Sequence, residues 1–283
     1  PLVFEVAKKA LTTNGSEGVS AWPFPNVDTA EKARAHCQAS QSTGTTYISK
    51  VFGLYCLIAD EQATSAAKAF WQHTGLGASS RLAAIALNQE EAPSQIDGNT
   101  ARTTIRSRLS DIYCCQSKNI SLHPSGMAAL ANALEAINII RPNKPILQLG
   151  FPYVDVLKLP QIIFSGSDLL LENDLNRVAT ELDQKHPSAI IVELPSNPML
   201  QCIDLLKISR LAHERGIPVI ADDTIGSATN IDALPYADLI FSSLTKSFAG
   251  RGDILAGALV ISPNSHWEKE LIQSCAANQA TQL

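Results

Sequence analysis

The sequence lacks the features of a membrane protein, a nucleic-acid-binding protein or a disulfide-framed protein. Its 283 residues contain no run of about 20 uncharged apolar residues, the length that a membrane helix needs. Charges of both signs are mixed, the formal net charge is −5, and no basic run favours a nucleic acid or an anionic membrane. The six cysteines form no C-x-x-C pair and no regular spacing. We therefore expect a globular cytoplasmic protein with reduced thiols and a small soluble partner.

Several common catalytic motifs are also missing. Neither a G-x-S-x-G element nor an H-E-x-x-H pair occurs, which argues against an α/β-hydrolase and a zinc protease. The histidines show no ligand spacing, so we expect no metal site. The segment GLGASS (residues 75–80) lacks the third glycine of a dinucleotide loop and follows a helical pattern, so it does not predict a Rossmann fold.

Apolar runs alternate with amphipathic segments from about residue 145 onward. The expected strands are PILQLG, QIIFS, SAIIVEL, IPVIAD, ADLIFSSL and LAGALVIS, and helices are expected over residues 126–139 and 204–215. This alternation is typical of an α/β domain with a mainly parallel sheet.

The first hundred residues have a different texture, rich in Ser, Thr and Gln. Residues 50–59 are strand-like and residues 61–73 are helix-like, and the turn-rich segment EAPSQIDGNT indicates a boundary near residues 93–99. We therefore divide the chain into an N-terminal extension of uncertain fold, residues 1–95, and a large α/β domain, residues 96–283.

Polar residues stand directly after four of the apolar runs. In a parallel sheet, ligands collect beyond the carboxyl ends of the strands, so these residues are the candidates for a site. They are Tyr153 after PILQLG, residues 193–197 after SAIIV, Asp222 after IPVIA, and residues 243–246 after ADLIF.

Lys246 and Asp222 have the chemistry of a cofactor site. A lysine after a buried strand is expected to be desolvated, which lowers its pKa and frees the amine to attack an aldehyde; the alternative is an ordinary surface lysine. A strand-end carboxylate at Asp222 could keep a pyridine nitrogen protonated, although Asp222 could equally cap a turn or helix.

Ser125, Gly126 and Met127 open the helix expected over residues 126–139. A helix start built of small residues offers free backbone N–H groups and the positive dipole end to a phosphate, although any well-capped helix looks the same. Ser243 and Thr245 could add hydroxyl donors, or could simply form a turn. A phosphate cradle, an aromatic residue, a strand-end acid and a strand-end lysine, in that order, are what an enzyme that uses pyridoxal 5'-phosphate (PLP) requires.

Four of these segments resemble the Cys/Met-metabolism PLP-dependent enzymes, the cystathionine γ-synthase group. The matching stretches are SGMAAL, ELPSNP, VIADDT and SSLTKSFAGRGDILAGALV, and FWQHTGLGASSRLA is similar to the N-terminal region of fungal-type members. The resemblance implies the large domain of PLP fold type I, the aspartate-aminotransferase-like fold.

The resemblance also implies roles for individual residues. Lys246 would carry PLP as a Schiff base and move protons, and Tyr153 would stack on the cofactor ring, although it could equally be a packing residue. The implied cofactor-binding residues are Ser125, Gly126, Met127, Tyr153, Asn197, Asp222, Thr224, Ser243, Thr245 and Lys246.

The implied reaction is γ-replacement, in which cysteine displaces the acyl group of an O-acylated homoserine and cystathionine forms. A β- or γ-lyase would use the same cofactor residues, and a truncated, non-catalytic protein of this fold is the alternative from another class. The family's active sites also imply a homo-oligomer.

The sequence departs from the family pattern in three places. The stretch PSQIDGNT has neither residue of the usual Tyr-x-Arg element, Ser247 stands where an aromatic residue is common, and Arg251 stands where a histidine is common. The chain also ends where the family continues, so we expect the C-terminal small domain to be absent from it.

Overall fold

The computed structural model describes residues 2–13, 20–40, 43–172, 174–278 and 282. Contacts divide the chain into two compact units, residues 1–99 and residues 100–283. Within the described residues, no helix has both the length and the apolar character needed to cross a membrane.

The first unit is built around a three-stranded antiparallel sheet with the order β1-β3-β2. Residues 50–59, expected as one strand, instead contribute to a hairpin, because Phe52 and Gly53 both have positive φ angles (52° and 82°) and form a two-residue turn. Buried side chains of α1, β3 and α4 form its core. Its elements are α1 (Leu2–Thr13), β1 (Ser20–Phe24), α2 (Val27–Ala39), β2 (Thr46–Val51), β3 (Leu54–Ala59), α3 (Thr64–Thr74) and α4 (Ser80–Ala86).

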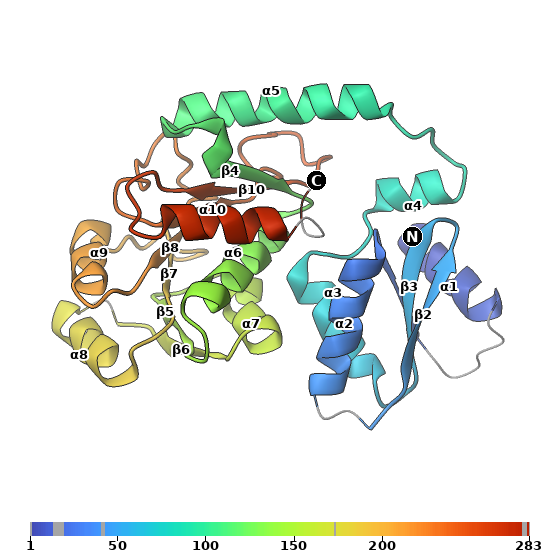
Figure 1. The fold of residues 1–283 in the computed structure, drawn as a ribbon, viewed down its shortest axis with the longest axis horizontal. Helices are drawn as coiled ribbons and strands as arrows, with labels where there is room; N and C mark the ends of the chain where they lie inside the picture. Colours follow the sequence, from blue (N-terminus) through green and yellow to red (C-terminus); the bar gives the residue numbers. More distant parts are fainter. Residues whose placement is uncertain (1, 14–19, 41–42, 173, 279–281, 283) are drawn as a thin grey trace. The chain divides into compact units, whose positions relative to one another are not determined.

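The second unit is an α/β domain around a seven-stranded sheet with the order β4-β10-β9-β8-β7-β5-β6 (Figure 1). The strands from β9 to β6 are parallel, and β10 runs antiparallel to both of its neighbours. The mainly parallel sheet predicted from the sequence is confirmed. The strands are β4 (Ile120–His123), β5 (Ile146–Leu149), β6 (Ser167–Leu170), β7 (Ile190–Glu193), β8 (Val219–Asp222), β9 (Leu239–Ser242) and β10 (Gly257–Ile261).

Helices cover both faces of this sheet. Because side chains alternate along a strand, Ile190 and Val192 of β7 belong to one core cluster with α5, α8 and α9, while Ile191 belongs to the other with α6, α7 and α10. Most strand residues are therefore apolar on both faces, with a few interior exceptions such as the buried Gln148 of β5 and Ser121 of β4. The helices are α5 (Gln95–Tyr113), α6 (Gly126–Ile140), α7 (Val154–Ile163), α8 (Leu175–Lys185), α9 (Leu205–His213) and α10 (Glu268–Ala277), with a 3₁₀ turn, η1 (Ser117–Asn119).

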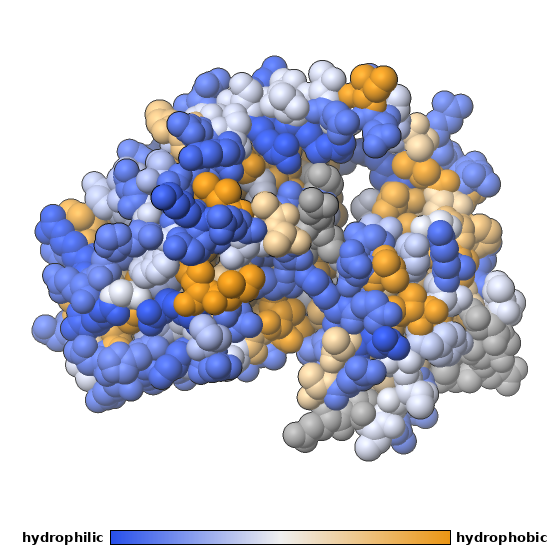
Figure 2. All heavy atoms as spheres, viewed as in Figure 1, coloured by the Kyte–Doolittle hydropathy of each residue, from blue (hydrophilic) through white to orange (hydrophobic). Residues whose placement is uncertain are grey.

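We expected a turn-rich boundary over residues 93–99, but α5 begins within it, at Gln95. Residues 95–99 are helical, because the Ser94 hydroxyl accepts a hydrogen bond from the Asp97 N–H (3.1 Å) and so caps the start of α5. The surface over α5 is mostly hydrophilic in Figure 2, in agreement with the burial of only Leu109 and Tyr113 along its length.

Two strands of the second unit differ from expectation. The run QIIFS is not a strand: residues 161–163 end α7, and β6 begins only at Ser167, after Gly166 with a φ of 91°. Strand β4 was not predicted, because four residues that include Ser121 and His123 carry little apolar signal. The helices expected over residues 126–139 and 204–215 are confirmed, and side chains of Ser125 and Asp204 cap them.

Candidate active site

The sheet brings the predicted site residues to one edge. Strands β5, β7, β8 and β9 are parallel, and β4 points the same way because both β4 and β9 are antiparallel to β10. A cavity of 510 Å³ opens at their carboxyl ends, within the 300–1,000 Å³ typical of small-molecule sites. It is lined by all ten predicted residues: Ser125, Gly126, Met127, Tyr153, Asn197, Asp222, Thr224, Ser243, Thr245 and Lys246.

The start of α6 forms one wall of the cavity. The Ser125 hydroxyl accepts the Ala128 N–H (3.0 Å), so the helix begins at Gly126 with its first N–H groups free of intrahelical partners. A Cβ atom at Gly126 would lie 2.9 Å from the Ser243 Cβ, so only glycine fits this close approach. The N–H groups and the positive end of the α6 dipole can therefore receive an anion from the cavity.

The loop after β9 forms the adjoining wall. The Ser243 N–H donates to the Thr224 hydroxyl (2.9 Å), which fastens this loop to the end of β8. The Thr245 hydroxyl donates to the Ala256 carbonyl (3.2 Å) and accepts the Ala256 N–H (3.1 Å). Thr245 thus has the turn-forming contacts considered from the sequence, and its hydroxyl would have to release Ala256 before it donated to a ligand.

Lys246 lines the cavity but is not desolvated as expected. Strand β9 ends at Ser242, and the following loop carries Lys246 to an exposed position. The expectation of a buried lysine was therefore wrong, because the loop separates Lys246 from the apolar strand. Its amine is accessible to a ligand in the cavity.

Two buried acids end neighbouring strands. Glu193 and Asp222 are cross-strand partners at the ends of β7 and β8 and are 7% and 5% exposed. Desolvation raises the pKa of each to about 7; hydrogen bonds from Thr224 oppose this for Asp222, and the charge of Glu193 adds to it. Asp222 also accepts the Thr224 N–H (2.9 Å), so it forms a local turn as well as facing the cavity.

A third buried acid, Asp223, follows Asp222 directly in the chain. Asp223 is fully buried, and its Oδ2 atom accepts the hydroxyl of Tyr113 (2.8 Å), while its Oδ1 atom has no partner among the described residues. Burial raises the pKa of Asp223. The carboxyl ends of β7 and β8 therefore concentrate acidic groups that lack cationic partners among the described residues.

Tyr153 and Asn197 lie on the loops after β5 and β7. Tyr153 is 39% exposed and precedes α7 without a side-chain cap. Its backbone N–H donates to the Glu193 carboxylate (2.9 Å). Sequence reasoning gave no role to several other residues that line the cavity: Val156, Glu193, Ile225, Phe241, Ser247 and Leu255. Glu193 had a signal, its position at a strand end, but its contact with Tyr153 spans 40 residues.

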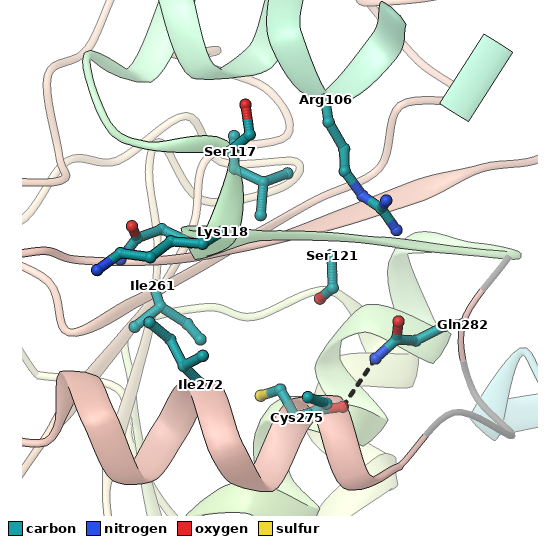
Figure 3. Close-up of a pocket in the computed structure, with 11 residues that line it drawn as sticks. Arg106, Ser117, Lys118, Ser121, Ile261, Ile272, Cys275 and Gln282 are labelled. Atoms are coloured by element: carbon teal, nitrogen blue, oxygen red, sulfur yellow. Dashed lines mark hydrogen bonds between the residues drawn. The ribbon is translucent and has the colours of Figure 1, made fainter. Parts of the chain in front are cut away.

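A second cavity, of 570 Å³, lies between α5, β4 and α10. In Figure 3, Arg106 extends from α5 over Ser121 of β4, and Gln282 donates to the Cys275 carbonyl (2.8 Å). None of the predicted site residues lines it, and its described lining contains no carboxylate that could face a pyridine nitrogen. The described residues also contain no group of three His, Cys, Asp or Glu side chains that could hold a metal ion.

The chain belongs to the Cys/Met metabolism PLP-dependent enzyme family, whose model matches residues 60–280. Residues 2–79 match the N-terminal domain of fungal trans-sulfuration enzymes. The family and the fungal type predicted from the sequence are therefore confirmed.

Three relatives place the chain within this family. The L-2-amino-4-chloropent-4-enoate dechlorinase/desaturase of Streptantibioticus cattleyicolor is 32% identical over 94% of this chain and 56% of that protein. The cystathionine gamma-synthase of Neurospora crassa is 36% identical over 55% of this chain and 27% of that protein. A crystal structure of cystathionine gamma-synthase from Xanthomonas oryzae pv. oryzae, in complex with cystathionine, has a TM-score of 0.56 and 22% identity over 69% of this chain and 50% of that chain, and confirms the fold. The chain spans about half the length of the first curated relatives that it matches.

The cavity fits the cofactor of this family, PLP. The start of α6 lines the cavity with N–H groups that have no intrahelical partner and can receive a phosphate, and Asp222 is a buried acid that gains from a cationic partner. Lys246 supplies an accessible amine at the same cavity.

Proposed function

We propose that this protein catalyses γ-replacement on an O-acylated homoserine with cysteine as the incoming thiol, giving cystathionine. One observation carries the proposal: a single cavity holds an accessible lysine, a buried strand-end acid and a helix-start anion site. The similarity to the Neurospora crassa cystathionine gamma-synthase supports this substrate class.

Each group has a task in this proposal. When bound, PLP supplies an electron sink for the electron pair left on the substrate carbon. Asp222 holds a proton on the pyridine nitrogen, and its burial strengthens that ion pair. Gly126, Met127, Ser243 and Thr245 bind the phosphate, with Ser125 shaping the helix start and Thr224 fixing the loop of Ser243.

Lys246 and Tyr153 act on the reacting side of the cavity. The Lys246 amine would hold the cofactor covalently and, once released, would remove protons from the substrate carbons next to the leaving group and return them after the replacement. Tyr153 packs its ring against the cofactor ring, and Asn197 hydrogen-bonds to the ring hydroxyl. The acyl group leaves as a carboxylate, and the thiol of cysteine takes its place.

A β- or γ-lyase is the second candidate. The dechlorinase/desaturase of Streptantibioticus cattleyicolor favours testing for elimination as well as replacement, because its name describes a different reaction from that of the cystathionine gamma-synthases. An assay with acylated homoserine with and without cysteine, and a second with cystathionine alone, distinguishes synthase from lyase.

We also propose a homo-oligomer that covers the cavity edge. Exposed apolar side chains follow β5, β7, β8 and β9, on the loops or, for Val154, at the start of α7: Phe151, Val154, Met199, Leu200, Ile225, Phe248, Ile254 and Leu255. Apolar side chains around a site favour contact with another protein surface. Sedimentation velocity tests this, and a monomer at every concentration would contradict it. The cytoplasmic location stays a prediction.

The proposal is tested by the visible absorbance of the protein with added PLP. We expect a protein-bound band, and after borohydride reduction we expect the label on Lys246. Lys246→Ala should lose both the band and the label, whereas Lys207→Ala, which alters an exposed lysine of α9 paired with Asp204 (2.9 Å), should keep both. A label on another lysine, or an unchanged spectrum in Lys246→Ala, would overturn the assignment, and the non-catalytic alternative would then take precedence.

A further inference from the structure

Glu193 occupies the centre of the site without a role in the scheme above. Its strand, β7, lies between β8, which ends at Asp222, and β5, which leads to Tyr153. The side chain is 7% exposed and lines the cavity. It forms no ion pair within the described residues, so hydrogen bonds must offset the free-energy cost of removing this carboxyl group from water.

The Glu193 carboxylate faces the backbone of two loops. Its Oε2 atom accepts the Tyr153 N–H at 2.9 Å, and the backbone of Asn197 lies close enough to oppose the rise in its pKa. Tyr153 lies at the start of α7, where a capping-box glutamate would normally accept the same N–H from within the helix. Glu193 provides this cap from a different strand.

We infer that Glu193 is a positioning residue, which fastens the loops of Tyr153 and Asn197 to the strand beside Asp222 and so holds both side chains in place for PLP. The inference rests on the proposed function. It separates two parts of the site: Asp222 would contact the cofactor, and Glu193 would act through the two loops.

The charge of Glu193 is secondary to its acceptor oxygen. Burial raises its pKa to about 7, so a substantial fraction of the carboxyl is neutral at neutral pH while its oxygen still accepts the Tyr153 N–H. Glutamine has nearly the same shape and keeps one acceptor oxygen, whereas alanine removes both. Glu193→Gln and Glu193→Ala therefore distinguish two possibilities. In the first, which we call the brace, an acceptor oxygen at residue 193 holds the loops in place; in the second, the site requires a negative charge there.

The matched control is Glu181. It is also 7% exposed, but it lies on α8 away from the cavity lining and pairs with Arg177 (2.8 Å) and Lys185 (3.1 Å). Glu181→Ala removes an equally buried carboxylate and so reports the effect of lost stability alone.

Amide hydrogen exchange of the protein without PLP tests the brace directly. Glu193→Ala should accelerate exchange in peptides that cover residues 150–157 and 194–200 by about tenfold, because the Tyr153 N–H loses its acceptor and the Asn197 backbone loses the carboxylate beside it. Glu193→Gln and Glu181→Ala should stay within about threefold of the wild type in these peptides. Unchanged exchange in Glu193→Ala would overturn the inference.

PLP binding then tests the consequence for the cofactor. Glu193→Ala should weaken PLP affinity about tenfold and reduce the visible circular dichroism of bound PLP, which reports a fixed ring orientation, while Glu193→Gln should restore both. Equal loss in both variants would overturn the brace in favour of a charge requirement. If the wild-type chain binds no PLP, the proposed function fails, and the exchange rates still decide whether Glu193 braces the loops.

Discussion

Buried acids lie at both ends of the central strands, but they differ in how fully they are hydrogen-bonded. At the amino end, Asp238 precedes β9, is 1% exposed, and accepts hydrogen bonds from the Val219 N–H (2.8 Å), the Ser265 hydroxyl (2.7 Å) and the His213 ring (2.9 Å). At the carboxyl end, Glu193 and Asp222 are also buried (7% and 5% exposed), but within the described part of the chain their hydrogen bonds come only from backbone groups and the side chain of Thr224.

This difference distinguishes Asp238, an acid that stabilises the fold, from Asp222, an acid available to a ligand in the cavity. Asp238 ties β8, β9 and the loop before α10 together, and its hydrogen bonds offset the cost of desolvation. Asp222 lacks such compensation, and its raised pKa records that cost. A cationic ligand at the carboxyl end would provide the missing partner.

The largest effect is expected from Asp238→Ala. The change leaves the buried Val219 N–H without an acceptor and frees the loop of Ser265, so we expect a loss of about 3 kcal/mol in the free energy of unfolding. Urea unfolding measures this, and Asp238→Asn, which keeps one acceptor, should lose less. PLP affinity should not change, because Val219 and Asp222 are three residues apart, or about 10 Å along β8. A large loss of affinity in the folded variant would contradict the division between the two ends.

Asp222→Asn should have the opposite effect: weaker PLP binding without a loss of stability. Asparagine keeps an oxygen for the Thr224 N–H but no charge for a pyridine nitrogen, so we expect PLP affinity to fall about 10- to 100-fold, the value of a charge-assisted hydrogen bond. The free energy of unfolding without PLP should be unchanged or higher, because a desolvated acid is removed. Equilibrium titration and urea unfolding give both numbers. Unchanged affinity would exclude Asp222 as the partner of the cofactor.

The sequence predicted which residues line this cavity better than it predicted the elements around it. Asp222 and Tyr153 were found because each follows an apolar run, and parallel strands necessarily bring such positions together. Strand β4 was missed because an edge strand of four residues needs little apolar content, and the end of α7 was misread as a strand because Ile162 and Ile163 are β-branched.

Contacts between distant segments could not be predicted at all. The bond from Tyr153 to Glu193 depends on β5 and β7 being neighbours, which no local pattern encodes. The expected burial of Lys246 failed for a related reason: the apolar run predicts where β9 lies, but the loop after it determines exposure. Local pattern therefore predicts which residues lie at the edge, and topology determines what they contact.

The smallest expected effect is the pH dependence of stability without PLP. The folded-state pKa values of Glu193 and Asp222, about 7, lie above their ordinary values, so the native state binds more protons than the unfolded state between about pH 4 and 7. Stability should therefore fall as pH rises through this range. Asp183, Asp204 and Glu268 have lowered pKa values and lose their contribution only at more acidic pH.

The window from pH 5 to 6.5 isolates the site acids. His213, whose pKa Asp238 raises, contributes stability that is complete below its unfolded pKa of about 6.5 and is lost only above it. Across this window the free energy of unfolding should fall in both proteins, and by about 1–2 kcal/mol less in Asp222→Asn than in the wild type, because the variant retains only one of the two acids. Identical slopes in the wild type and Asp222→Asn would show that Asp222 is as well compensated as Asp238, and the contrast between the two ends of the sheet would then fail.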